Sequence, residues 1–360
     1  MSKIPPPYNN QNEKKKFFSL EIIDTNEQFF NFMKTLPKLY HEKKGIWRGI
    51  PESRFKLYNS LQRENIITNQ LKSTQDVIKR IEDSTDKLAK WNRGVVRKYF
   101  DKNHNIPNVP LYAALSILQH HGCETPFLDW TRNPNVALYF ATHPQFKTII
   151  KENIDNYFSI YFITTEHAYY NFTSKSGYIE VYSYDTENAY VKNRVNFVIE
   201  HGGDEYLQKE ARENAITELI QKKINNNEST AHSIEQFPIQ RIEDSLEEKI
   251  THFLNVNYNI TAQEGLFILN AYPSMPLEEA IHHRLHSPII KGNEKQIDEW
   301  EKRNIENFIC YDIHKKFIPR IFDALKSERI NITKETMEPD FKKLKNEITF
   351  DKITNKLREK

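Results

Sequence analysis

The sequence predicts an α+β protein in which helices surround a small mixed or split β-sheet. Three observations support this fold class: strand-length apolar runs recur far apart in the chain, apolar residues between them recur at helical spacing, and one long charged segment has a helical pattern. The expected strands cover residues 45–50, 127–130, 157–163, 178–182 and 260–269. We expect these strands to form one sheet.

The expected helices follow from apolar residues spaced three or four apart. They cover residues 26–36, 74–100, 111–118, 134–140 and 317–325. The first 16 residues are polar and rich in proline, and we expect a disordered lead-in there. Residues 17–350 are expected to form one enlarged domain, with a helical insertion at about 186–250.

Charge and composition limit the classes of partner. The chain has 51 basic and 49 acidic residues, so its net charge of +2 gives no strong signal for nucleic acid or an anionic membrane. The two cysteines are too few for a disulfide framework or a zinc cluster, and the histidines near residue 283 lack a clear third ligand. Neither a signal peptide nor an apolar run of membrane length is visible. We therefore expect a cytoplasmic protein without a metal.

The residues with the most chemical potential are concentrated in one stretch, residues 118–142. A helix ends near Gly122, a short strand begins at Phe127, and Asn133 followed by Pro134 is typical of a helix start. The run Asp129-Trp130-Thr131 should therefore lie where a strand leads into a helix N-terminus. Backbone amides at such a place can bind an anion or a nucleotide.

This stretch, Leu-Gln-His-His-Gly through Asp-Trp-Thr to Ala-Leu-Tyr-Phe-Ala, resembles the central signature of the FRG domain. The sequence departs from that pattern over residues 123–126, where the order of Pro and Thr is exchanged, and at Phe127. The name-giving aromatic-Arg-Gly motif is matched at residues 47–49. Residues 259–267 are similar to a late family strand, with Asn259 where Arg is usual, and residues 317–340 resemble the closing segment.

The order of these motifs is similar to that of ADP-ribosyltransferases of the Arg, Ser-Thr-Ser, Glu type, and the similarity implies NAD as a substrate. Carried over, Arg48 would hold the phosphate or ribose, and Thr131 with Trp130 would line the nicotinamide site. Gln263 or Glu264 would occupy the position of the catalytic strand. The implied activity is ADP-ribosyl transfer or NAD hydrolysis on an ADP-ribosyltransferase-like sheet.

Several roles stay open at this level. Asp129 either caps the following helix or has a functional role. Gln263 cannot act as a base, so if Gln263 is the functional residue, either Asp129 supplies the catalytic carboxylate or the site binds a nucleotide without turning it over. Only one of residues 263 and 264 can face a cleft from a strand. Gly49 would let a bound group approach the backbone. His120 is preferred over its neighbour as the site histidine. We expect one cleft to be lined by Arg48, His120, Asp129, Thr131 and Gln263. Arg48 should then lie within about 15 Å of Asp129, the span of a drug-sized ligand site.

A second class of function is a non-catalytic module that recognises a nucleotide or a nucleic acid. A nuclease that uses His120 and Asp129 is the weaker third hypothesis, because no metal-ligand spacing accompanies the two residues. The resemblance also implies a bacterial setting with roles in phage defence or toxin systems. The macromolecular target is not indicated by the sequence.

Overall fold

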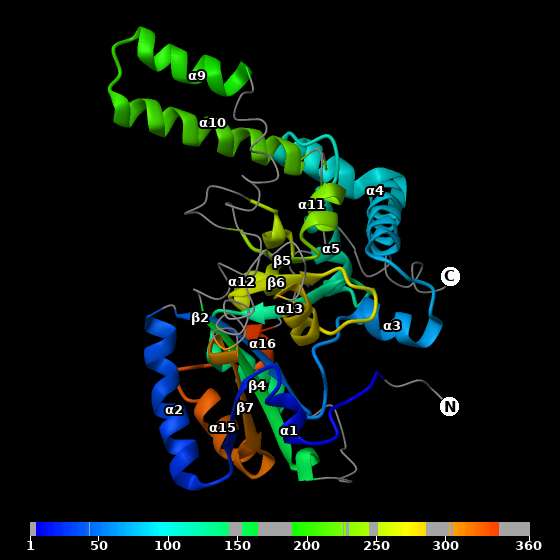
Figure 1. The fold of residues 1–360 in the computed structure, drawn as a ribbon, viewed down its shortest axis with the longest axis vertical. Helices are drawn as coiled ribbons and strands as arrows, with labels where there is room; N and C mark the ends of the chain where they lie inside the picture. The colour runs from blue at the N-terminus through cyan, green and yellow to red at the C-terminus, as the bar shows by residue number, and fades with distance from the viewer. Residues whose placement is uncertain are drawn as a thin grey trace.

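In the part of the chain that the structure describes, one seven-stranded mixed sheet is covered by helices (Figure 1). The computed structural model describes residues 5–42, 44–143, 153–164, 189–225, 227, 230–244, 251–285, 302 and 305–337. The strands are β1 (Ser19–Ile23), β2 (Gly45–Ile50), β3 (Phe127–Thr131), β4 (Tyr157–Thr164), β5 (Ile239–Ile242), β6 (Gly265–Asn270) and β7 (Phe308–His314). Their order is β1-β7-β4-β2-β3-β6-β5; β1 and β7 are parallel and the other neighbours are antiparallel.

Three of the helices around the site begin at a side-chain cap. Thr25, Ser73 and Asn133 accept hydrogen bonds from backbone N–H groups of the first turns of α2, α4 and α6. The larger helices are α2 (Asn26–His41), α3 (Ser60–Thr68), α4 (Thr74–His104), α5 (Leu111–His120), α6 (Pro134–Thr142), α9 (Ala189–Glu200), α10 (Glu205–Asn225), α13 (Leu277–Leu285) and α15 (Ile318–Leu325). Short helices are α1 (Gln11–Lys14), α11 (Thr230–Gln236), α12 (Tyr258–Ala262) and α16 (Lys334–Met337).

The two faces of the sheet have different coverings. On one face, α2, α6 and α15 pack on β2, β4 and β7, while α4 and α5 pack on β3 and β6. On the other face, the N-terminal segment and α13 bury Tyr8, Phe18 and Leu277 against β3, β4 and β6. Because side chains alternate along a strand, neighbouring site residues can face opposite layers of the core.

The structure confirms the α+β class and three of the expected strands, β2, β3 and β4. The expected strand at 178–182 lies outside the described residues. The expected strand at 260–269 is wrong in its first half, where α12 and a turn precede β6. Within the expected helical insertion, α9, α10 and α11 are helical, but β5 belongs to the sheet. β7 was not anticipated.

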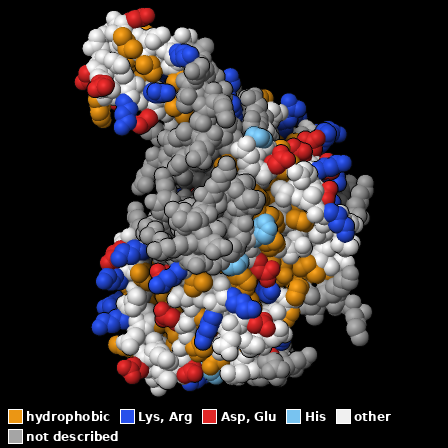
Figure 2. All heavy atoms as spheres, viewed as in Figure 1, with side chains coloured by type: hydrophobic (Ala, Val, Ile, Leu, Met, Phe, Trp, Pro, Cys, Tyr) orange, Lys and Arg blue, Asp and Glu red, His pale blue; other side chains and the backbone are white. Residues whose placement is uncertain are grey.

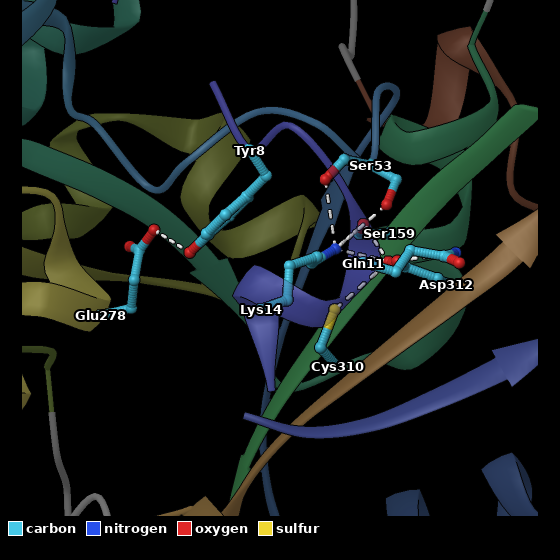
Figure 3. Close-up of polar contacts among 8 residues, drawn as sticks. All are labelled: Tyr8, Gln11, Lys14, Ser53, Ser159, Glu278, Cys310 and Asp312. Carbon is cyan, nitrogen blue, oxygen red and sulfur yellow. Dashed lines mark hydrogen bonds and ion pairs between the residues drawn. The ribbon is translucent and has the colours of Figure 1, made fainter. Parts of the chain in front are cut away.

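The N-terminal segment corrects the expectation of a disordered lead-in. Its described part, from residue 5 onward, contains α1, and the side chain of Lys14 is fully buried. Lys14 Nζ lies 2.5 Å from Asp312 Oδ1 and 2.9 Å from Ser159 Oγ, and it also donates to Ser53 (Figure 3). Nearby, Tyr8 Oη donates to Glu278 over 2.6 Å. These buried contacts hold the segment against the sheet.

Helices α9 and α10 form an antiparallel hairpin that projects from the body (Figure 1). Several of its large apolar side chains are exposed beside acidic and basic ones (Figure 2). A cavity of about 830 Å³ lies between this hairpin and residues 105–107. Among the helices that the structure describes, none is long and apolar enough to cross a membrane.

Candidate functional site

The site is built where β2 and β3 stop pairing. β2 and β4 pair over six residues, whereas β2 and β3 share one register pair, Trp47 with Thr131. Beyond that pair, the guanidinium of Arg48 enters the gap and Nη1 donates to the carbonyl oxygen of Asp129. The side chain thus supplies a hydrogen bond that a neighbouring strand would otherwise give. Arg48 and Asp129 are fixed relative to each other as a result.

The carboxylate of Asp129 is exposed yet held by polar contacts. Its side chain is 55% exposed, and Oδ2 lies 3.8 Å from Arg48 Nη1. Gln119, near the end of α5, donates from Nε2 to both carboxylate oxygens over 3.1 and 3.3 Å. Arg48 therefore lies far inside the expected limit of about 15 Å from Asp129. The chemical roles of the two residues stay predictions.

Arg48 is a mostly buried cation. Burial lowers the pKa of its guanidinium; the charge of Asp129 opposes this, and the charge of Arg63 on α3 adds to it. Its Nε is buried and has no hydrogen-bond partner within the described ranges. Arg63 Nη1 donates to the carbonyl of Tyr58 over 2.7 Å, which holds this second arginine near the pair. Two guanidinium groups thus accompany one carboxylate.

Two expected contributors to the cleft have structural roles instead. Trp130 is 2% exposed and packs in the core with Leu128, because it alternates with Asp129 along β3. Gly49 lies against α6, and a Cβ there would lie 1.8 Å from the carbonyl oxygen of Ala137. The glycine is therefore required for close helix–strand packing, and the approach of a ligand to its backbone stays a prediction.

Gln263 and Glu264 are not strand residues. Gln263 is the C-cap of α12, and Glu264 has a φ of 47°, the left-handed conformation that often ends a helix. The turn directs the two side chains to different partners. Gln263 Nε2 donates to the carbonyl of Met337 over 3.1 Å. Strand alternation therefore does not decide which of the two residues faces a cleft.

The carboxylate of Glu264 is engaged in structural hydrogen bonds. It accepts from Tyr40 Oη over 3.0 Å and from Asn133 Nδ2 over 2.9 Å, and so ties α2 to the start of α6. Thr131 is buried as well: its hydroxyl donates to the carbonyl of Gln263 over 2.6 Å and accepts from Asn133 N–H. This cluster fixes the end of β3, and the Thr131 hydroxyl already uses its one proton.

His120 lies at the exposed end of α5, next to Gln119. Its Nδ1 is 3.1 Å from Asn259 Nδ2, so the ring is tied to α12. Within the parts of the chain that are described, no group of three or more His, Cys, Asp or Glu side chains could hold a metal ion. The cavity beside the hairpin is not lined by Arg48, Gln119 or Asp129.

Sequence reasoning missed three residues that shape the site. Gln119 was visible in the signature but had no assigned role, and it orients Asp129. Arg63 has no local signal, because its helix reaches the site only through tertiary contacts. Tyr40 contacts a residue 224 positions away, which no local pattern can reveal.

Comparison with known proteins gives one finding. Residues 43–148 match the family model of the FRG domain, a segment that runs from the start of β2 past α6 and so includes Arg48, Gln119 and Asp129. No curated protein matches the chain, and no solved structure does.

Proposed function

Because residues 43–148 match the family model of the FRG domain, we propose that the chain binds NAD or a related nucleotide at the Arg48–Asp129 contact and cleaves or transfers the ADP-ribosyl part. The observation that carries the proposal is the carboxylate of Asp129, which is more than half exposed and yet held by Gln119 and Arg48. A relation to ADP-ribosyltransferases, action in the cytoplasm and a role in bacterial defence or toxin systems belong to the same proposal.

In the proposed reaction, Asp129 and Arg48 have different roles. Breaking the bond between ribose C1′ and the nicotinamide nitrogen develops positive charge on the ribose, and nicotinamide leaves with the electron pair. A carboxylate held close to C1′ stabilises this charge. Water or an acceptor then forms the new bond to C1′, and Asp129 takes the proton that this nucleophile loses. Arg48 binds the diphosphate through guanidinium N–H groups that Asp129 does not use.

The contacts favour Asp129 over Glu264 as the carboxylate. Glu264 already accepts hydrogen bonds from Tyr40 and Asn133, and moving it toward a substrate would break contacts that join two helices. Asp129 keeps its exposed edge free for a ligand while Gln119 fixes its orientation. The analogy with a late-strand glutamate is therefore replaced by a carboxylate on β3.

Incubating the purified full chain with NAD and following nicotinamide release tests the proposal. We expect Asp129→Asn to lower the rate about 100-fold or more, because it removes the group that stabilises the ribose cation. Arg48→Ala should weaken NAD binding. Glu264→Gln should stay within a few-fold of the parent rate. Asp86→Asn is a matched control, because this carboxylate is a surface partner of Lys90 on α4.

The outcomes separate the competing functions. Activity lost in Glu264→Gln but kept in Asp129→Asn would return the carboxylate role to Glu264. NAD binding in calorimetry without nicotinamide release would favour the non-catalytic recognition module. The absence of both NAD binding and nicotinamide release would end the NAD proposal.

A further inference from the structure

A buried hydroxyl group anchors the end of the Gln119 amide that faces away from Asp129. An amide side chain presents a donor at one end and an acceptor at the other, and only the donor end attracts a carboxylate. Gln119 Nε2 donates to Asp129, and its Oε1 accepts a hydrogen bond from the hydroxyl of Thr125. Thr125 is fully buried.

The Thr125 hydroxyl has one proton to give, and its surroundings decide where that proton goes. Its oxygen accepts from the backbone N–H of Phe127 over 3.4 Å, so the proton is available for Gln119 Oε1. If the amide were reversed, its NH₂ group would face the hydroxyl and its oxygen would face the carboxylate of Asp129. The reversed state places two acceptors against each other and is disfavoured.

The position of Thr125 is itself fixed by the start of α3. Its backbone N–H donates to Ser60 Oγ over 2.9 Å, and its carbonyl accepts from the N–H of Leu61 over 3.2 Å. Further on, α3 carries Arg63, which is held at the Tyr58 carbonyl. The contacts that place Thr125 therefore also place the second arginine beside Asp129.

We infer that Thr125 and Gln119 are positioning residues that keep the Asp129 carboxylate oriented toward a bound ligand. This inference rests on the proposed function, in which Asp129 is the reacting carboxylate. Thr125 acts only through Gln119, since its hydroxyl contacts the amide oxygen and Asp129 contacts the amide nitrogen. In this inference, neither Thr125 nor Gln119 exchanges a proton with the substrate.

The inference makes a graded prediction for three variants. Thr125→Val removes the hydroxyl with little change in volume, so the amide oxygen of Gln119 loses its anchor. Thr125→Ser keeps the hydroxyl and should behave as the parent. Gln119→Leu removes the amide outright, and adding Thr125→Val to it should have no further effect, because the threonine then has nothing to orient.

The test reads Asp129 directly, with or without turnover. In the full chain with ¹³C-labelled aspartate carboxyl groups, NMR follows the chemical shift of the Asp129 carboxyl carbon at neutral pH, and the signal is assigned by its loss in Asp129→Asn. We expect this chemical shift to move in Thr125→Val and in Gln119→Leu, because the donor to the carboxylate is displaced or lost. Thr125→Ser should leave the chemical shift in place.

The rate of nicotinamide release should fall in the same two variants. An unchanged Asp129 chemical shift in Gln119→Leu would overturn the inference, and this variant decides even if Thr125→Val does not fold. A double variant whose chemical shift differs from that of Gln119→Leu would show that Thr125 acts on Asp129 by another route, and would overturn it too. If no NAD is cleaved at all, the proposed function fails, while the chemical shift still tests the positioning roles.

Discussion

Replacing Lys14 by methionine would leave the carboxylate of Asp312 buried without its cation. Both side chains are fully buried, and 2.5 Å separates their charged atoms. Burial alone would lower the pKa of Lys14, but its acidic partners outweigh that effect and raise the pKa, so the lysine is charged at neutral pH. Removing one partner of a buried ion pair typically costs about 3–5 kcal/mol.

The surroundings of Asp312 set the expected value at the lower end of that range. In Lys14→Met, Asp312 would keep the hydrogen bonds from Ser159 Oγ at 2.7 Å and Gln11 Nε2 at 3.2 Å. Methionine also keeps most of the volume of the lysine stem. We therefore expect the free energy of unfolding to fall by about 3 kcal/mol at pH 7.

Urea denaturation followed by tryptophan fluorescence measures this loss, with the slope of the transition checked for a constant value. The double variant Lys14→Met/Asp312→Asn removes both charges and should return to within about 1 kcal/mol of the parent, because pairs replaced by neutral groups are often tolerated. A loss below about 1 kcal/mol in the single variant, or a double variant as unstable as the single one, would refute the reasoning.

Three further predictions concern other buried contacts. Burial raises the pKa of Glu278 to about 7, so between about pH 4.5 and pH 7 the folded state holds a proton that the unfolded state has released. The free energy of unfolding should therefore fall as pH rises through this range. Glu278→Gln should remove up to about 3 kcal/mol of that fall, measured by urea denaturation at pH 4 and pH 8. Gly49→Ala should destabilise the fold by about 1–3 kcal/mol or more, because its Cβ would lie 1.8 Å from Ala137 O and only a shift of α6 could relieve the clash; an unchanged melting temperature would contradict this. Asn133→Ala should cost about 1 kcal/mol in thermal unfolding through loss of the cap on α6, and a Glu264→Gln background should reduce that cost if the Asn133–Glu264 hydrogen bond contributes to it.

The sequence predicts those elements whose conformation depends on neighbouring residues in the chain. The apolar run at residues 45–50 is a strand because its side chains are buried on both faces, and Asn133 followed by Pro134 starts a helix because both residues favour that geometry. The nearness of Arg48 and Asp129 was also anticipated, from the order of motifs.

The remaining site geometry depends on contacts that sequence patterns do not encode. The apolar character of residues 260–269 suggested one strand, but Glu264 adopts a left-handed conformation that glutamate itself does not favour. Lys14 stands in the polar first 16 residues, which suggested a disordered lead-in, yet its partner Asp312 is 298 positions away. Such pairings emerge only when the chain is folded.

The parallel pairing of β1 with β7 has a consequence for synthesis on the ribosome. β1 hydrogen-bonds to β7, from Ser19 with Ile309 to Ile23 with Ile313, and β7 is the strand that joins β1 to the rest of the sheet. At about 5–20 residues per second, translation reaches β7 roughly 15–60 s after it has passed β1. During that interval the N-terminal segment has left the ribosome while its place in the sheet does not yet exist. The nascent chain therefore carries an unpaired β1 for most of its synthesis, until β7 supplies its partner in the sheet.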